Sequence, residues 1–168
     1  MKDSNVLVYK NQCSTISIEN DLVHVIALDG TKYSYELGSK EAFDVISDLW
    51  LRSGWDNKYV YGFSWFGRPI IQLPEDMFKI QELIYRLRPK IIIETGVAHG
   101  GSLVFYAGIL EILKSGIVIG VDIDIRKHNR AEIDAHILSN RIKLIEGSSI
   151  DQEIFNQVCC VVEDETNI

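Results

Sequence analysis

Apolar and polar residues alternate along the first part of the chain, as in half-buried β-strands. Between residues 15 and 37, three runs place an apolar side chain at every second position: Ile16 and Ile18, then Val23 and Val25, then Tyr33, Tyr35 and Leu37. An Asp29-Gly30 pair separates the last two runs and predicts a hairpin. The spacing becomes helical over 40–51. These elements predict either a small β-and-helix appendage over residues 1–70 or extra strands that cap a larger domain, and the pattern favours the cap.

Residues 54–71 combine aromatic side chains with glycine. Such a segment is either a loop that faces a ligand or a packed connector whose rings fill gaps in the core, and the pattern favours the connector. The following helix has clear boundaries. Proline and two acidic residues begin it at Pro74, its apolar stripe includes Ile80 and Leu87, and Pro89 ends it.

Short apolar runs and helical patterns alternate from residue 90 onward. The pattern predicts strands over 91–93, 117–121, 142–145 and 159–162, and helices over 102–113, 129–138 and 149–158. Continuous apolar strands are typical of a parallel sheet that is covered on both faces. The predicted fold is therefore α/β, with a doubly wound, Rossmann-like sheet over residues 71–168.

Composition and charge narrow the function classes. The 168 residues are 46% hydrophobic and 24% charged, which is typical of a globular domain with at most a small appendage. A formal net charge of -7 argues against a nucleic-acid partner. No apolar run is long enough to span a membrane, and the N-terminal residues show no signal peptide. Three cysteines, two of them adjacent, form neither a disulfide framework nor a zinc motif, so we expect a cytoplasmic protein.

The first predicted strand of this sheet leads directly into a glycine-rich turn and a helix. The turn contains Gly96, Gly100 and Gly101, which allow a ligand to approach the backbone closely. Ligands of open α/β sheets bind at the carboxyl ends of strands, where such a turn lies. The spacing differs from the G-x-G-x-x-G pattern of dinucleotide-binding folds. The alternative to ligand binding is a tight structural turn.

Acidic residues accompany the turn. Glu94 stands just before it, which suits a cationic ligand better than a pyrophosphate, and the second strand ends in Asp122 and Asp124, which could bind ribose hydroxyls. A nucleoside that carries a positive charge fits this combination, and S-adenosylmethionine is such a compound. The alternative for Asp122 is a helix cap. His99 is expected to be a solvated loop residue.

Four segments resemble one protein family. They are Ile92-Ile93-Glu94-Thr-Gly-Val-Ala-His-Gly-Gly-Ser102, Gly120-Val-Asp-Ile-Asp-Ile-Arg-Lys-His-Asn-Arg130, Ile145-Glu-Gly-Ser-Ser-Ile-Asp151 and Val161-Val-Glu-Asp164, and the segment from Gly67 to Pro74 also fits. They are similar to the cephalosporin hydroxylase and rhamnosyl O-methyltransferase family, whose members have the S-adenosylmethionine-dependent methyltransferase fold. The resemblance extends from about Trp65 to the end of the sequence.

The resemblance implies roles for individual residues. Glu94, Gly96, Gly100, Gly101 and Ser102 would hold the methionine part of S-adenosylmethionine. Asp122, or less favourably Asp124, would hold the ribose, and Ser148 and Asp151 would lie beside the adenine. Glu163 and Asp164 match an acidic pair that helps to bind Mg²⁺, which would orient and acidify a substrate hydroxyl.

The sequence departs from the family pattern after Asp151. The family has a further strand there, which ends in a block that supplies the first metal carboxylate and is followed by a helix, and this block is absent here. We therefore expect an incomplete methyltransferase sheet, either because residues are missing from this sequence or because the protein carries a deletion. An intact mass above 19.1 kDa would indicate missing residues.

The predicted function is a Mg²⁺-assisted O-methyltransferase that acts on a sugar hydroxyl of a polysaccharide, glycolipid or secondary metabolite. Two alternatives stay open: a degenerate, non-catalytic cofactor-binding module, and a nicotinamide-dependent oxidoreductase, which Glu94 and the glycine spacing oppose. The expected partner is a small-molecule or glycan substrate, and the acidic surface is compatible with a homo-oligomer.

Overall fold

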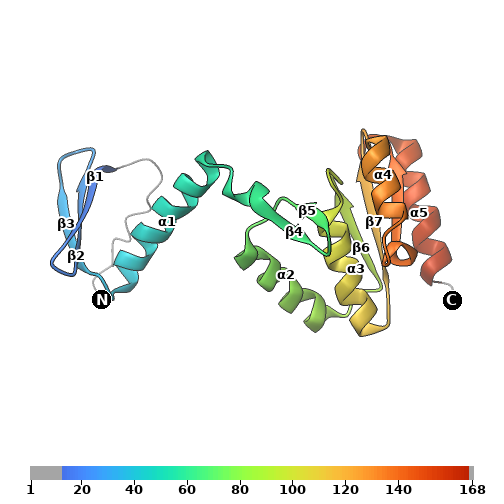
Figure 1. The fold of residues 1–168 in the computed structure, drawn as a ribbon, viewed down its shortest axis with the longest axis horizontal. Helices are drawn as coiled ribbons and strands as arrows, with labels where there is room; N and C mark the ends of the chain where they lie inside the picture. The colour runs from blue at the N-terminus through green and yellow to red at the C-terminus, as the bar shows by residue number, and fades with distance from the viewer. Residues whose placement is uncertain (1–12, 167–168) are drawn as a thin grey trace. The chain divides into compact units, whose positions relative to one another are not determined.

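A computed structural model describes residues 13–166 (Figure 1). The described residues up to Tyr59 form one compact unit, and those from Val60 onward form a second. The expected division at residues 70 and 71 differs from this boundary by a short β-hairpin, which packs on a helix of the second unit. None of the helices in the described part of the chain is both long and apolar enough to cross a lipid bilayer.

The first unit is a three-stranded antiparallel sheet with one helix. Strands β1 (Cys13–Glu19), β2 (Leu22–Ala27) and β3 (Lys32–Glu36) pair in chain order, and α1 (Lys40–Asp56) follows. The Asp29-Gly30 turn between β2 and β3 is confirmed, with Gly30 at a φ of 84°. The alternation predicted the core correctly, because Val23 and Val25 of β2 pack against Ala42 and Val45 of α1.

A short helical turn (Tyr59–Gly62) starts at the last residue of the first unit, and the second unit continues with a hairpin of β4 (Phe63–Trp65) and β5 (Arg68–Ile70). Helix α2 (Pro74–Leu87) begins and ends where the sequence predicts. The aromatic segment over residues 54–71 acts in part as the packed connector that we expected. The ring centroid of Trp65 lies 5.0 Å from that of Phe105 in the core.

A parallel sheet forms the centre of the second unit, in the order β6 (Ile91–Thr95), β7 (Ile117–Asp122) and β8 (Ile142–Glu146). Helix α3 (Gly101–Leu113) follows β6, and α4 (Lys127–Asp134) follows β7. A single helical turn (Ser139–Arg141) leads into β8, and α5 (Gln152–Thr166) comes after it. Figure 1 shows α3 and α5 on opposite sides of the sheet. The predicted α/β class with a Rossmann-like parallel sheet is confirmed.

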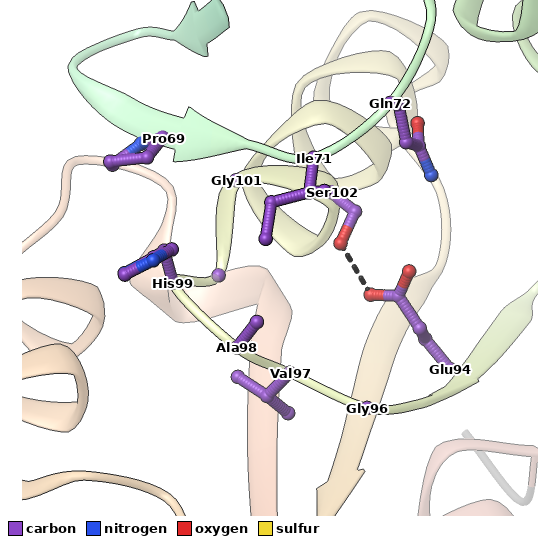
Figure 2. Close-up of a pocket in the computed structure, with 11 residues that line it drawn as sticks. Pro69, Ile71, Gln72, Glu94, Gly96, Val97, Ala98, His99, Gly101 and Ser102 are labelled. Atoms are coloured by element: carbon purple, nitrogen blue, oxygen red, sulfur yellow. Dashed lines mark hydrogen bonds between the residues drawn. The ribbon is translucent and has the colours of Figure 1, made fainter. Parts of the chain in front are cut away.

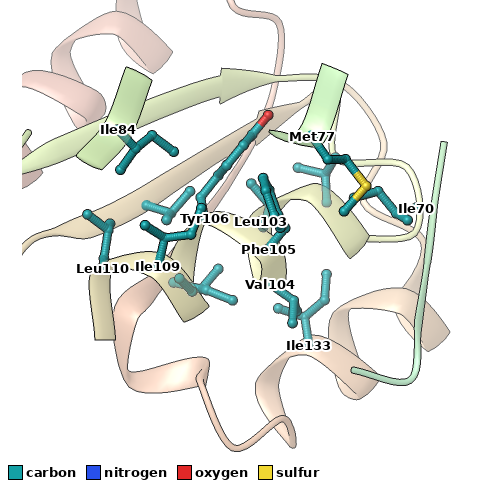
Figure 3. Close-up of a cluster of buried hydrophobic side chains, with 14 of the residues drawn as sticks. Ile70, Met77, Ile84, Leu103, Val104, Phe105, Tyr106, Ile109, Leu110 and Ile133 are labelled. Atoms are coloured by element: carbon teal, nitrogen blue, oxygen red, sulfur yellow. The ribbon is translucent and has the colours of Figure 1, made fainter. Parts of the chain in front are cut away.

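Alternation along the strands gives the sheet two apolar faces. On one face, Val118 and Ile142 join the larger core, which α3 dominates (Figure 3). Seven of the residues of α3 from Leu103 to Leu110 are buried there, which explains why this helix is apolar around most of its circumference. On the other face, Ile117, Ile119 and Val121 pack against α5.

The predicted strand over 159–162 is wrong, because these residues belong to α5. The run Val-Cys-Cys-Val-Val has no polar interruption, so periodicity over so short a window does not separate a strand from a helix. In the structure, Ile154, Val158, Val161 and Val162 form one helical stripe against the second face of the sheet. The helix predicted over 129–138 is also shorter and begins earlier, at Lys127.

Candidate functional site: the glycine turn and its two pockets

The turn between β6 and α3 needs glycine at two kinds of position. Gly96 and Gly100 have φ angles of 93° and 78°, which side chains with a Cβ rarely adopt. Gly101 has ordinary dihedrals, but a Cβ there would overlap the carbonyl oxygen of Pro69. The hairpin strand β5 can therefore pass directly over the first turn of α3, which brings Pro69 and Ile71 to the site.

Asp122, at the end of β7, holds this turn in place. Its Oδ2 accepts hydrogen bonds from the backbone N–H groups of Val97 at 2.7 Å and Ala98 at 3.3 Å, and its Oδ1 accepts from that of Asp124 at 3.1 Å. Partial burial works to raise the pKa of Asp122, but these N–H donors outweigh it and lower the pKa. The alternative role expected for Asp122 was a helix cap. A capping carboxylate also accepts hydrogen bonds from backbone N–H groups, but Val97 and Ala98 belong to the turn after a different strand, β6.

A buried arginine fixes the other side of the turn. Arg68 donates from Nε and Nη2 to the carbonyl of His99 at 3.0 and 2.6 Å, and from Nη2 to Oδ1 of Asn129 at 3.1 Å. Asn129 donates in turn to the carbonyl of Ala98 at 2.8 Å. Sequence reasoning assigned no role to either side chain. Their only signal was a position inside segments that resemble the family, because nothing local marks a contact between residues so far apart in the chain.

Glu94 is a partly buried carboxylate whose partners are neutral. It accepts a hydrogen bond from the Ser102 hydroxyl at 2.7 Å and a longer one from the Tyr106 hydroxyl at 3.4 Å. Burial raises the pKa of Glu94, and the two hydroxyl groups lower it by less. No lysine, arginine or histidine in residues 13–166 pairs with it. A carboxylate that is partly withdrawn from water and has no counter-charge is suited to a cationic ligand.

Two adjoining pockets meet at the turn. The first has a volume of about 100 Å³ and lies between Glu94, Gln72 and the first turn of α3, where Ser102 points at Glu94 (Figure 2). The second has a volume of about 390 Å³ and is lined by Asp122, Asp124, Arg126 and Asn129. Ile71, Ala98 and His99 line both pockets.

The structure brings most of the predicted cofactor residues together. The first pocket contains Glu94, Gly96, Gly100, Gly101 and Ser102, and the second contains Asp122 and Asp124. Ser148 and Asp151 lie in the segment between β8 and α5 and line neither pocket. His99 lines both pockets, so it is a site residue as well as the loop residue that we expected.

The predicted metal residues do not form a metal site. Glu163 and Asp164 lie on α5 rather than at the end of a strand, and consecutive helical residues face different directions. The part of the chain that the structure describes contains no group of three or more His, Cys, Asp or Glu side chains placed to hold a metal ion. The described residues, Glu163 and Asp164 among them, therefore do not fit Mg²⁺.

Comparisons with known proteins match the same region. A family model described as Rhamnosyl O-methyltransferase/CmcI matches residues 57–168. A rhamnosyl O-methyltransferase from Mycobacterium leprae (strain TN) is 28% identical over 109 residues, which are 61% of this chain and 45% of that protein. The chain thus spans less than half the length of this curated relative.

Solved structures of CmcI are also similar. An apo structure is 25% identical, with 58% of this chain and 40% of the other covered and a TM-score of 0.47. A structure with Mg and SAM is also 25% identical, with 57% and 40% covered and the same TM-score. The family model matches more than half of the chain, so this protein belongs to the Rhamnosyl O-methyltransferase/CmcI family.

Proposed function

We propose that this chain binds S-adenosylmethionine at the glycine turn and is the cofactor-binding part of a methyltransferase. The observation that carries the proposal is the partly buried Glu94 carboxylate, which has two hydroxyl partners and no cation among the described residues. The amino group of the methionine moiety would supply the positive charge. The N-terminal N–H groups of α3 have no partner within the helix, and they would receive the carboxylate of the same moiety.

The second pocket would hold the nucleoside. Asp122 uses both carboxylate oxygens to fix the backbone, whereas the side chain of Asp124 makes no hydrogen bond within the described residues. We therefore assign the ribose hydroxyls to Asp124 first and to the remaining lone pairs of Asp122 second. This reverses the order that the resemblance implies. The adenine roles of Ser148 and Asp151 stay predictions.

The proposed reaction is transfer of a methyl group to a hydroxyl oxygen of a small-molecule acceptor. S-adenosylmethionine supplies the methyl group: the acceptor oxygen forms a bond to the methyl carbon, the C–S bond breaks with its electron pair on sulfur, and the hydroxyl proton passes to a base or solvent. The name of the relative favours a sugar hydroxyl. No step is assigned to Mg²⁺, because the residues that the structure describes do not form its site. A cytoplasmic location also stays a prediction.

Calorimetric titration with S-adenosylhomocysteine, the demethylated product, tests the proposal. We expect the full chain to bind it more tightly than NAD⁺. We expect Glu94→Gln to weaken binding by about ten- to a hundredfold, as for loss of a charge-assisted hydrogen bond. The control is Glu82→Gln, an exposed residue of α2 that pairs with Lys79. Unchanged affinity in Glu94→Gln, or tighter binding of NAD⁺, would refute the proposal.

A further inference from the structure

Ile71 places an accessible apolar side chain where the two pockets adjoin. It follows β5 directly, and it is one of three residues that line both pockets, together with Ala98 and His99. Figure 2 shows its side chain extending into the first pocket, in the direction of Ala98. The residue is 37% exposed, so a ligand in the pockets can reach it.

The packing of β5 sets the direction of this side chain. Ile70, the last residue of β5, is 1% exposed and belongs to the larger core. Because consecutive side chains alternate in direction along a strand, Ile71 points away from that core. The chain is also anchored just before it, since the Pro69 carbonyl oxygen lies 2.2 Å from where a Cβ on Gly101 would be. The fold therefore holds Ile71 over the glycine turn.

The polar groups of the site locate the part of the ligand that meets Ile71. In the proposed function, Glu94 binds the amino group of S-adenosylmethionine and Asp124 binds the ribose hydroxyls. One ligand that reaches both must pass the wall that the pockets share, where Ile71 lies. The segment between the two ends of S-adenosylmethionine carries the sulfur atom and has no N–H or O–H group. Aliphatic atoms suit such a segment, whereas polar groups fix the ends.

We propose that Ile71 contacts the sulfur-bearing segment of the bound cofactor and covers one side of it against water. This inference rests on the proposed function, and it gives a role to the connector between β5 and α2. It also has a consequence for charge. S-adenosylmethionine carries a positive charge and a methyl group at sulfur, whereas S-adenosylhomocysteine has neither. A charge introduced at residue 71 should therefore act on the two ligands differently.

Two variants of nearly equal shape test this contact. Ile71→Asp and Ile71→Asn differ in charge, and in calorimetric titrations of the full chain the ratio of the affinities for S-adenosylmethionine and S-adenosylhomocysteine is compared. We expect Ile71→Asp to raise this ratio about fivefold over Ile71→Asn, because the carboxylate attracts the sulfonium. Attraction of the amino group acts on both ligands and cancels in the ratio. Equal ratios in the two variants overturn the inference and leave the proposed function standing.

The control for added charge is Ile112→Asp, at an exposed residue of α3 that lines neither pocket. It should keep the wild-type ratio. If Ile71→Asp does not fold, Ile71→Ala keeps the test decisive. This variant should weaken binding of S-adenosylhomocysteine about fivefold and of adenosine, which lacks the sulfur-bearing segment, less than twofold. Equal weakening of both ligands also overturns the inference. Absence of S-adenosylhomocysteine binding to the wild-type chain refutes both the inference and the proposed function.

Discussion

Replacing Arg68 by methionine should destabilise the second unit, because the arginine side chain is buried and satisfies two carbonyl oxygens from other elements. Its exposed fraction is 8%, and its loss would leave the His99 carbonyl and Oδ1 of Asn129 without their donors. At about 1–3 kcal/mol for each buried acceptor left unsatisfied, the expected loss is at least about 2 kcal/mol. The ion pair with Glu132, which is 67% exposed at its side chain, adds little.

The assay must follow each unit separately, because a chain with two compact units need not unfold in one step. Hydrogen exchange in increasing urea, read by mass spectrometry on peptides from β7, gives the opening free energy of the second unit. Peptides from β2 serve as an internal reference. Arg130→Met is the matched control, since this arginine makes one long ion pair at 3.6 Å and should lose less than about 1 kcal/mol. Equal losses in the two variants would refute the reasoning.

Three further predictions concern the pockets and α5. Burial raises the pKa of Glu94 above its ordinary value of 4.5, and a cationic ligand binds the ionised form of the carboxylate. The affinity for S-adenosylhomocysteine should therefore increase as the pH rises through that pKa. Calorimetric titrations of Glu94→Gln should show no such pH dependence. Gly101→Ala should abolish ligand binding, because the added Cβ would push β5 away from α3. The control, Gly62→Ala, should keep binding, because a Cβ there meets nothing within 4 Å. Retained binding in Gly101→Ala would contradict the close approach of β5 to the first turn of α3. In the hydrogen-exchange assay on β7, Val158→Asp should lower the free energy of unfolding by about 2 kcal/mol or more, because Val158 packs against the sheet. The control, Gln157→Asp, should lower it by less than about 0.5 kcal/mol. The reverse order would contradict the packing of the apolar stripe of α5 on the sheet.

Local pattern was sufficient for most elements of this chain. Alternation over residues 15–37 predicted the three antiparallel strands, and the glycine turn after 91–93 predicted the start of α3. The positions of Glu94 and Asp122 predicted that their carboxylates lie at the same edge of the sheet, because parallel strands bring their carboxyl ends to one edge. Each of these inferences depends on neighbours in the sequence, whose geometry is set by backbone sterics and by solvent.

Tertiary structure decided which partner each side chain meets. An uninterrupted apolar run such as 158–162 suits a buried strand or one face of a helix, and only packing against Ile119 and Ile145 assigns it to α5. The same holds for Arg68, whose partner His99 comes from a distant loop, and for Asp122, which binds backbone N–H groups of the turn after β6. Hydrogen bonds between distant segments depend on how the hairpin, the sheet and the helices pack together, and a linear sequence carries no local signal of that packing.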